Sequence, residues 1–295
     1  MPPERVEIRT LLRHTDVPMM IANWRTLIAC CADPFGTVVH DDGSLTDEDR
    51  ESLVRSLPNT RILDRADADD RMAESLARFR HAEAFRRSSV WGLKLLDVVL
   101  AEPGDCFYLD GDIRFRRRFG GLFRADIPRG RCVFLRDPVW TAYSVRPWHL
   151  LGPRRLRLVD GINTGLTLID RACFDLEFVD WFLAQPAWRV VPAWVEPTCW
   201  AALAERANGH AVSPRQIVNL YPRSRVDSET IGVHLLSSYR ALFSTLAAGE
   251  PDLTLPARPV ELVGLGRLGA VALGWNQLRR KWQNERARRR PATGR

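Results

Sequence analysis

The first 115 residues alternate short segments of strand character with longer segments of helical character. Val6–Leu12 alternates apolar and polar residues, which predicts a strand, and residues 17–30 have apolar residues at helical spacing. Further strands are expected over Thr37–His40, Thr60–Asp64 and Cys106–Leu109, and further helices after Thr46, over residues 68–80 and over residues 88–101. Strands that alternate with helices form a parallel sheet with helical crossovers. The pattern therefore predicts an α/β fold.

Two acidic motifs follow predicted strands. "DDGS" (Asp41–Ser44) comes after the second strand and "DGD" (Asp110–Asp112) after the fourth. In such sheets ligands bind beyond the carboxyl ends of the strands, so the shared position of the motifs indicates a site there. Two carboxylates one residue apart can hold a divalent cation. The alternative for "CFYLDGDIRF" is a β-hairpin, because Asp-Gly is the strongest short hairpin signal.

Two other motifs carry less weight. "DRADADD" (Asp64–Asp70) contains a second D-x-D, but no apolar strand leads directly into it, so a solvated helix start is expected. "VGLGRLG" (Val263–Gly269) matches the dinucleotide pattern G-x-G-x-x-G, yet only 26 residues follow it and they are basic. A dinucleotide unit needs a second strand and an acidic residue about 20 positions later. We expect no nucleotide site at these glycines.

The net charge of +7 is confined to the C-terminus. Residues 279–295 contain eight Lys or Arg and one Glu, so the other residues sum to about zero. Nucleic-acid binding needs a basic surface that neutralises phosphates, and the rest of the chain has no basic excess to provide one. Nucleic acid is therefore not an expected partner. The chain has only two lysines, Lys94 and Lys281, which makes Lys94 more noticeable.

The N-terminus and the cysteines indicate a cytoplasmic protein. "MPPERVEIRT" lacks the apolar region of a signal peptide, and no uninterrupted apolar run approaches the ~18 residues of a membrane span. The six cysteines form no C-x-x-C pair, and most have apolar neighbours. Reduced thiols, not disulfides or a zinc site, are expected.

Four segments together resemble the metal-dependent GT-A glycosyltransferases, most closely the family 8 type that includes glycogenin and bacterial lipooligosaccharide galactosyltransferases. They are the strand into "DDGS", "KLLDVVL…CFYLDGD", "INTGLTLID" and "VHLLSSYR", and the resemblance spans Val6 to Leu246. It implies a Rossmann-like mixed sheet flanked by helices. Residues 1–250 would form a single catalytic domain, and residues 251–295 a C-terminal helical extension.

The resemblance implies a metal site and a donor site. Asp110 and Asp112 match the D-x-D that binds manganese, and His234 matches the third metal ligand, so the expected cofactor is Mn²⁺ or Mg²⁺. The expected ligands of a nucleotide-sugar donor, with a UDP-sugar favoured, are Asp41, Asp42, Lys94, Asp110, Gly111, Asn163, Thr164, Gly165 and Arg240. The expected catalytic residues are Asn163 and Glu196. Glu196-Pro197-Thr198 stands where related bacterial sequences are expected to have E-Q-T.

The chemistry of sugar transfer accounts for these residue types. Breaking a sugar–phosphate bond leaves a nucleoside diphosphate with additional negative charge, which a bridging divalent ion stabilises by several kcal/mol. A neutral His234 can complete the coordination, and Arg240 offers a planar fork of donors to phosphate. Gly111 has no Cβ, so the backbone can pass close to the phosphates. Asp41 and Asp42 can accept hydrogen bonds from a base or a ribose.

Three alternatives remain open at this point. A nucleotidyltransferase on a similar sheet would want a glycine-rich basic loop after the first strand, which "RHTDVPMM" does not supply. A phosphatase of the haloacid-dehalogenase type also has a strand followed by D-x-D. Its motif normally lies near the N-terminus, however, and continues with Thr or Val where this chain has Arg114. The non-enzyme alternative is an inactive scaffold in which "DGD" is only a turn.

The C-terminus predicts a membrane contact. Leu265, Leu268, Val271, Trp275, Leu278 and Trp282 recur at spacings of three or four, and Arg279, Arg280, Lys281 and Arg286 follow or flank them. Such a helix suits the interface of an anionic membrane. The acceptor is then expected to be a glycan or a lipid-linked molecule, with the enzyme on the inner face of the cell membrane. The alternative is a stripe that packs on the catalytic domain, followed by a solvated basic end.

Overall fold

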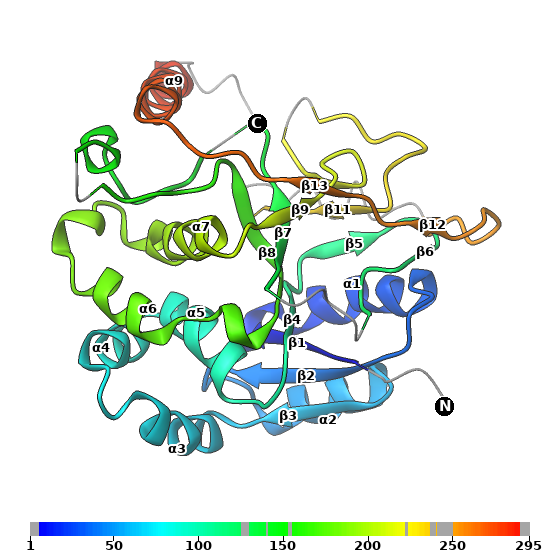
Figure 1. Ribbon diagram of the computed structural model, residues 1–295. Coiled ribbons are helices and arrows are strands. Elements are labelled where there is room, and N and C mark those ends of the chain that lie inside the picture. The colour runs from blue at the N-terminus through cyan, green and yellow to red at the C-terminus, as the bar shows by residue number, and fades with distance from the viewer. Residues whose placement is uncertain are drawn as a thin grey trace.

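The computed structural model of the protein describes residues 6–124, 130–139, 141–152, 155–221, 224–236, 240 and 250–289 (Figure 1). The first elements are β1 (Val6–Leu12), α1 (Val17–Cys30), β2 (Phe35–Asp41), α2 (Asp47–Ser56), β3 (Thr60–Leu63), α3 (Arg65–Leu76), α4 (Arg80–Ser88), α5 (Val90–Leu100) and β4 (Cys106–Leu109). They are followed by β5 (Ile113–Phe115), β6 (Phe119–Gly120), β7 (Cys132–Arg136), β8 (Ile162–Ile169), α6 (Leu176–Leu183), α7 (Val195–Arg206), β9 (His210–Val212), β10 (Ile217–Asn219), β11 (Gly232–His234), β12 (Arg258–Pro259), β13 (Leu262–Gly264) and α9 (Ala270–Arg289).

The largest sheet has eight strands in the order β13-β9-β7-β8-β4-β1-β2-β3. Strands β4, β1, β2 and β3 are parallel, as the alternation of strands and helices predicts. Strand β8 runs antiparallel to both of its neighbours, β4 and β7. A mixed sheet flanked by helices confirms the predicted fold class.

Helices cover both faces of this sheet (Figure 1). One hydrophobic core lies between the sheet and helices α3 to α7, and a second lies between the sheet, helices α1 and α2, and strands β5 and β6. Successive strand residues point to opposite faces. Tyr108 accordingly belongs to the first core, whereas Leu109, its neighbour on β4, belongs to the second.

The local signals for α2 act as the sequence predicts. Thr46 accepts a hydrogen bond from the backbone N–H of Asp49, and the Asp49 carboxylate accepts one from the backbone N–H of Thr46. This reciprocal capping satisfies two backbone donors that have no partner within the helix. The "DDGS" loop therefore ends in a firmly capped helix.

The chain leaves the large sheet at "DGD". Strand β4 pairs with β1 and β8, whereas β5 pairs antiparallel with β11 in a separate sheet of order β10-β11-β5. The hairpin interpretation of "CFYLDGDIRF" is therefore wrong, because its two strands are not paired with each other. Asp110 closes a strand of one sheet and Asp112 opens a strand of the other.

Residues beyond 250 also contribute to the sheets. Strand β12 pairs with β6, and β13 pairs antiparallel with β9 at one edge of the large sheet. The glycines of "VGLGRLG" thus lie in this edge strand and the loop after it, not in a parallel βαβ unit. The boundary at residue 250 stays a prediction, and the strands after it join the body.

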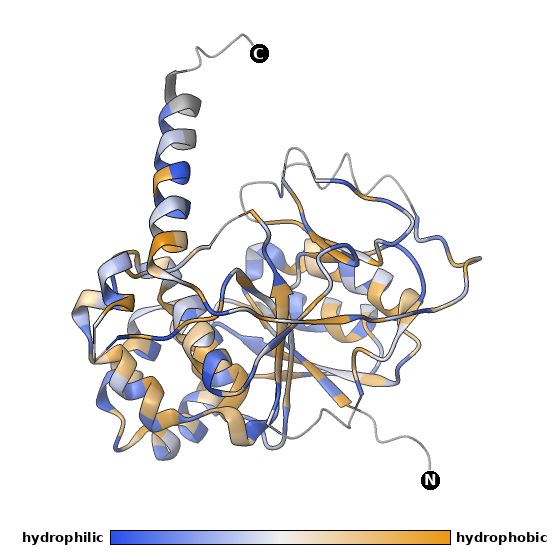
Figure 2. Ribbon diagram, turned by 45° about the horizontal axis from the view of Figure 1, so that its top comes forward, coloured by the Kyte–Doolittle hydropathy of each residue, from blue (hydrophilic) through white to orange (hydrophobic). Residues whose placement is uncertain are grey.

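Helix α9 projects from the body of the protein (Figure 2). It is anchored at its N-terminal end, where Leu273 is fully buried in the first core. The Asn276 side-chain amide donates to Thr141 Oγ1 at 3.0 Å, and that of Gln277 donates to the backbone carbonyl of Val145 at 2.6 Å. One side of the helix therefore faces the body.

The apolar stripe expected around this helix divides into two parts. Leu265 and Leu268 precede the helix and pack against the first core. By contrast, the exposed fractions of Val271, Trp275, Leu278 and Trp282 are 75, 70, 62 and 55%. We call these four side chains the exposed face of α9, since their spacing places them on one side of the helix. Within the described ranges, no helix combines the length and apolarity needed to cross a membrane.

Replacing Gly92 by alanine should destabilise the protein. Helices α4 and α5 are in close contact there, and a Cβ on Gly92 would lie 2.4 Å from the Phe85 carbonyl oxygen and 2.6 Å from Arg86 Cα. Because these are backbone atoms, the helices must separate, so Gly92→Ala should lower the free energy of unfolding by about 3 kcal/mol in urea titrations. Gly266→Ala, whose Cβ would meet nothing within 4 Å, is the control. Equal stability of the two variants would contradict this packing.

Candidate active site

Helix α1 packs against the Asp110–Asp112 turn, which joins the two sheets. The side-chain amide of Asn23 donates to the Gly111 carbonyl at 3.0 Å, and a Cβ on Gly111 would lie 3.0 Å from the Met20 side chain. The glycine therefore lets α1 approach this turn closely. The approach of a diphosphate to the Gly111 backbone stays a prediction.

The three-stranded sheet aligns three polar residues at one end. His234 of β11 pairs with Ile113 of β5, which places it beside Asp112. Asn219 of β10 pairs with His234 on its other side. The register of β10, β11 and β5 thus brings together residues that are far apart in the sequence.

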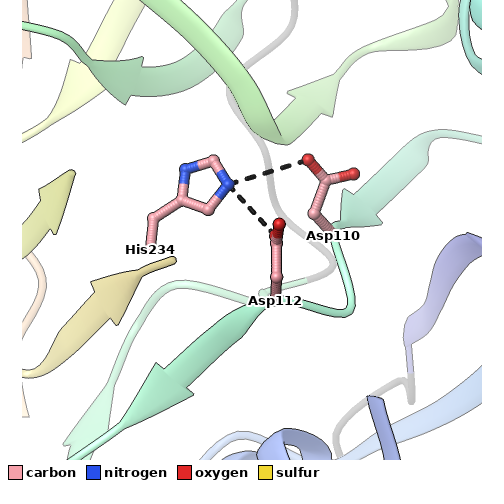
Figure 3. Close-up of side chains that lie close together, drawn as sticks. All are labelled: Asp110, Asp112 and His234. Carbon is pink, nitrogen blue, oxygen red and sulfur yellow. Dashed lines mark ion pairs between the residues drawn. The ribbon is translucent and has the colours of Figure 1, made fainter. Parts of the chain in front are cut away.

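Asp110, Asp112 and His234 converge on one point (Figure 3). His234 Nε2 lies 3.1 Å from Asp112 Oδ1 and 3.9 Å from Asp110 Oδ2, and ligand atoms of all three residues lie within 4.8 Å of one another. Asp112 and His234 are each only 3% exposed. The convergence predicted from the sequence is therefore present.

Asn219 fixes the orientation of the His234 ring. The Asn219 side-chain Oδ1 lies 3.0 Å from His234 Nδ1, and its amide nitrogen donates to the Arg136 carbonyl. Because an amide oxygen only accepts hydrogen bonds, Nδ1 of His234 carries a proton. In the neutral ring, Nε2 then presents a lone pair toward the two carboxylates.

Gly165 provides the space for the same ring. A Cβ at this position of β8 would lie 2.4 Å from His234 Cε1 and 2.9 Å from both ring nitrogens. Any larger residue would displace the imidazole. The Gly165 carbonyl also accepts from the backbone N–H of Asp110 at 2.7 Å, so β8 supports two members of the cluster.

Two cations balance the carboxylates. Lys94 Nζ of α5 lies 2.9 Å from both oxygens of Asp110, and two guanidinium nitrogens of Arg240 lie 3.0 and 2.7 Å from Asp112 Oδ2. Burial alone would lower the pKa of Lys94, but the charge of Asp110 raises it above the usual value. Burial alone would raise the pKa of Asp112, but His234 and Arg240 together lower it. Both carboxylates are therefore held in ionic contacts.

Comparison with known proteins finds a structural likeness without a sequence likeness. No protein-family model matches the sequence, and no curated protein matches it significantly. Apo mouse xyloside xylosyltransferase 1 has a TM-score of 0.53 at 11% identity, over 80% of this chain and 99% of that chain. The galactosyltransferase LgtC with donor and acceptor sugar analogues gives 0.43 at 13% identity, over 85% and 97% of the two chains. The apo bifunctional glycosyltransferase WbbM gives 0.45 at 11% identity, over 80% and 46%.

The chain has a GT-A glycosyltransferase fold. The fold implied by the sequence resemblance is therefore confirmed. Within this GT-A fold, the Asp-Asp-His cluster lies where the chain passes from the large sheet to the small one.

Glu196 and Asn163 occupy neighbouring elements of this GT-A fold. Glu196 lies in the first turn of α7, is 1% exposed and accepts a hydrogen bond from Thr164 Oγ1 of β8 at 3.0 Å. Its other oxygen, Oε1, meets no donor at hydrogen-bond geometry among the described residues, although the Trp200 side chain lies close enough to favour the ionised form. Burial raises the pKa of Glu196 to about 7, although Lys94 opposes the shift. The Asn163 side chain accepts from the backbone N–H of Gly165 at 2.9 Å. The catalytic roles expected of Glu196 and Asn163 stay predictions.

Asp41 and Asp42 are engaged within their own loop at the end of β2. Asp41 Oδ1 accepts from the backbone N–H groups of residues 43–45, and its other oxygen contacts Arg50 at 2.5 Å. Asp42 accepts from the backbone and hydroxyl of Ser44. The GT-A fold thus does not bring either carboxylate into the Asp-Asp-His cluster, and their donor-binding role stays a prediction.

Three residues of the site escaped the sequence analysis. Asp16 follows β1 and contacts Arg240 at 3.3 Å, Tyr108 donates to Asp110, and Asn219 holds His234. For two of them the sequence contains a signal that could have been used. Asp16 follows a predicted strand, and Tyr108 lies two residues before Asp110, on the same face of β4. Asn219 offered no such signal, since β10 has only three residues.

The raised pKa of Glu196 predicts a pH-dependent stability. Between the ordinary value of 4.5 and about 7, the folded protein keeps a proton on Glu196 that the unfolded chain releases. The free energy of unfolding of the wild type should therefore fall as pH rises through this window, by about 3 kcal/mol at about 1.4 kcal/mol per pKa unit. Glu196→Gln removes this loss, so its stability relative to wild type should rise from pH 4.5 to 7 and then level off. A difference that stays constant from pH 4.5 to 8 would contradict the raised pKa.

Proposed function

We propose that the protein is a metal-dependent glycosyltransferase that transfers a sugar from a nucleoside-diphosphate sugar, favoured as a UDP-sugar, to a glycan or lipid-linked acceptor. The observation that carries the proposal is the Asp110–Asp112–His234 cluster in a GT-A fold, with Asp112 and His234 buried and Asp110 partly exposed. Residues 1–250 are proposed as the catalytic domain and residues 251–295 as its extension, which lends strands β12 and β13 to the body.

The three residues fit a divalent metal ion. Asp112 Oδ1 is buried and accepts no hydrogen bond from the described residues, and Asn219 leaves Nε2 of His234 available as a ligand atom. Two carboxylates and one imidazole suit Mn²⁺, and Mg²⁺ is the alternative because it too prefers carboxylate oxygens. Asp110, Asp112 and His234 would hold the ion. When bound, it supplies a positive charge next to the diphosphate leaving group.

The remaining residues provide charge and shape around that site. Lys94 and Arg240 form ion pairs with Asp110 and Asp112. We propose that their positive charges also attract the donor's phosphates. Asp41, Asp42, Gly111, Asn163, Thr164 and Gly165 are proposed to contact the donor, and Gly165 also keeps His234 in position.

Glu196 is proposed to act with Asn163 at the reacting sugar. A carboxyl group with a pKa of about 7 exchanges a proton readily near neutral pH, which suits an acid or base. Oε1 of Glu196 accepts no hydrogen bond of good geometry from the described residues. Thr164 holds the other oxygen. The burial of Glu196 keeps bulk water from its carboxyl group.

A membrane contact through α9 is part of the proposal. The exposed face of α9 presents two tryptophans, a leucine and a valine, and Arg279, Arg280 and Lys281 follow on the same helix. Aromatic and apolar side chains beside basic ones fit an anionic lipid surface, to which each basic residue contributes about 1 kcal/mol. The proposed location is the cytoplasmic face of a membrane that carries the acceptor.

Asp112→Asn should remove metal-dependent turnover and leave the fold intact. The amide is a poorer ligand than a carboxylate and lacks its charge, so Mn²⁺ affinity should fall by at least tenfold in calorimetric titrations. Hydrolysis of UDP-sugars with and without Mn²⁺ measures the activity. Unchanged turnover would exclude the assignment and would favour the inactive-scaffold alternative if the wild type also binds neither UDP nor metal.

Asp16→Asn is the matched control for this experiment. Asp112 belongs to the Asp-Asp-His cluster and also contacts Arg240. Asp16 contacts Arg240 but does not belong to the cluster. Asp16→Asn should therefore keep the wild-type affinity for Mn²⁺. If Asp16→Asn loses as much Mn²⁺ affinity as Asp112→Asn, the loss comes from a displaced Arg240 and not from ligation.

Replacing Trp275, Leu278 and Trp282 together by serine should abolish binding to anionic vesicles. The triple variant removes most of the exposed face of α9 and keeps the buried anchor Leu273. Co-sedimentation with vesicles of phosphatidylglycerol and phosphatidylcholine measures the binding. A variant with Val54→Ser and Leu253→Ser, which removes exposed apolar side chains elsewhere, should bind like the wild type. Equal sedimentation of the wild type and the triple variant would remove the support for a membrane role.

A further inference from the structure

A cavity of about 370 Å³ lies where α9 meets the body. Its walls come from the segment around Tyr143 and Arg146, from Trp194 just before α7, and from α9. The residues that α9 contributes include Arg280, Lys281 and Glu285. Three cations and one carboxylate thus face a space that the Asp-Asp-His cluster does not share.

The three cations of the cavity have no carboxylate partner among the described residues. Arg146, Arg280 and Lys281 form no ion pair with any carboxylate in that part of the chain, whereas Arg50, Arg61, Arg86 and Arg240 each do. Glu285 lines the cavity without pairing with them. The lining therefore keeps an excess of positive charge that an anionic ligand would balance.

Arg280 is held in place by an aromatic ring. Its guanidinium carbon lies 3.6 Å from the centre of the Trp194 ring. A guanidinium stacked on an indole keeps its edge N–H groups free to donate in a plane. Burial with no nearby carboxylate lowers the pKa of Arg280, which is the expected cost of a cation without a counterion. An anion in the cavity would offset that cost.

The cavity connects the proposed membrane helix with the proposed active site. Trp194 directly precedes α7, whose first turn carries Glu196. The Tyr143 hydroxyl donates to the Val159 carbonyl and accepts from the backbone N–H of Ile162, where β8 begins. A ligand of the cavity would therefore contact residues that adjoin the elements carrying Thr164 and Glu196.

We propose that this cavity binds the phosphate group of a membrane lipid, so that α9 and the cavity together hold a phosphate-bearing lipid beside the catalytic domain. The inference rests on the proposed membrane contact of α9. Planar guanidinium donors match phosphate oxygens, and Val190 and Val191 supply an apolar wall for the part of the lipid next to its phosphate. The lipid is the acceptor itself or a lipid that positions the enzyme, and phosphate recognition is common to both.

The test uses short-chain lipids that stay dissolved as monomers. Calorimetric titration of the full chain with dihexanoyl phosphatidic acid, dihexanoyl phosphatidylcholine and inorganic phosphate compares a lipid phosphate, a zwitterionic lipid and free phosphate. The full chain should bind phosphatidic acid at least tenfold more tightly than the other two. Equal affinity for inorganic phosphate would overturn the lipid assignment.

Two variants and a matched control locate the binding. Arg280→Gln, and separately the pair Arg146→Gln with Lys281→Gln, should each weaken phosphatidic acid binding by about fivefold or more, on the scale of about 1 kcal/mol per basic residue. Arg279→Gln removes the same charge from an exposed neighbour that does not line the cavity. Because the lipids are dissolved as monomers, the proposed contact of Arg279 with a membrane surface is not measured, and this variant should bind phosphatidic acid like the wild type. The paired variant changes two exposed side chains, so it tests the cavity even if Arg280→Gln disturbs the contact with Trp194. Equal weakening by Arg279→Gln would show a diffuse charge effect and overturn the site.

Binding of Mn²⁺ and UDP is measured on the same proteins. The cavity variants should keep the wild-type affinity for both, because none of the three cations belongs to the Asp-Asp-His cluster. Loss of phosphatidic acid binding in a protein that binds Mn²⁺ and UDP normally supports the cavity. A wild type that binds Mn²⁺ and UDP but not phosphatidic acid refutes the cavity alone, whereas one that binds neither Mn²⁺ nor UDP refutes the proposed function.

Discussion

Asp110 and Asp112 place two carboxylates close together, one partly exposed and one buried, and the architecture of the site balances their repulsion. With ligand atoms within 4.8 Å, two unit charges repel by about 3 to 4 kcal/mol at an effective dielectric constant of about 20. Lys94 from α5 and Arg240 from beyond β11 bring the compensating charge. Segments 146 residues apart in the sequence must therefore be in place before Asp112 can be buried, which couples the site to the long-range fold.

The sequence predicted the parallel half of the large sheet well, because that half is built from local signals. Residues 17–30 have the helical period and form α1, and Thr46 caps α2 as expected. The small sheet was not predictable in the same way. Strands β5, β10 and β11 have three residues each, too few to display a period, and β5 pairs with a strand more than 110 residues later. The local Asp-Gly signal therefore allowed a hairpin that the long-range pairing of β5 with β11 excludes.

The candidate site shows the same contrast between what local signals predict and what depends on long-range contacts. The local pattern marked Asp110 and Asp112, and a family resemblance linked them to His234 and Arg240, which local pattern could not connect. The four residues do meet in space. What the resemblance did not specify is how the chain supports them. The contact of Gly165 with the His234 ring and the hydrogen bond from that ring to Asn219 depend on strand register, which no motif encodes. Asp41 and Asp42 also make contacts that the motif did not specify, since Asp41 holds the loop backbone and Arg50 of α2, and Asp42 holds Ser44.

The exposed face of α9 also affects how the protein would behave when no lipid is present. Two copies could bury their tryptophans and leucines against each other, because hydrophobic burial does not distinguish a lipid tail from a second helix. Self-association and membrane insertion would then compete for one surface. The apparent molecular mass in size-exclusion chromatography should depend on protein concentration and on mild detergent. A dimer found without detergent would dissociate when the protein binds a membrane.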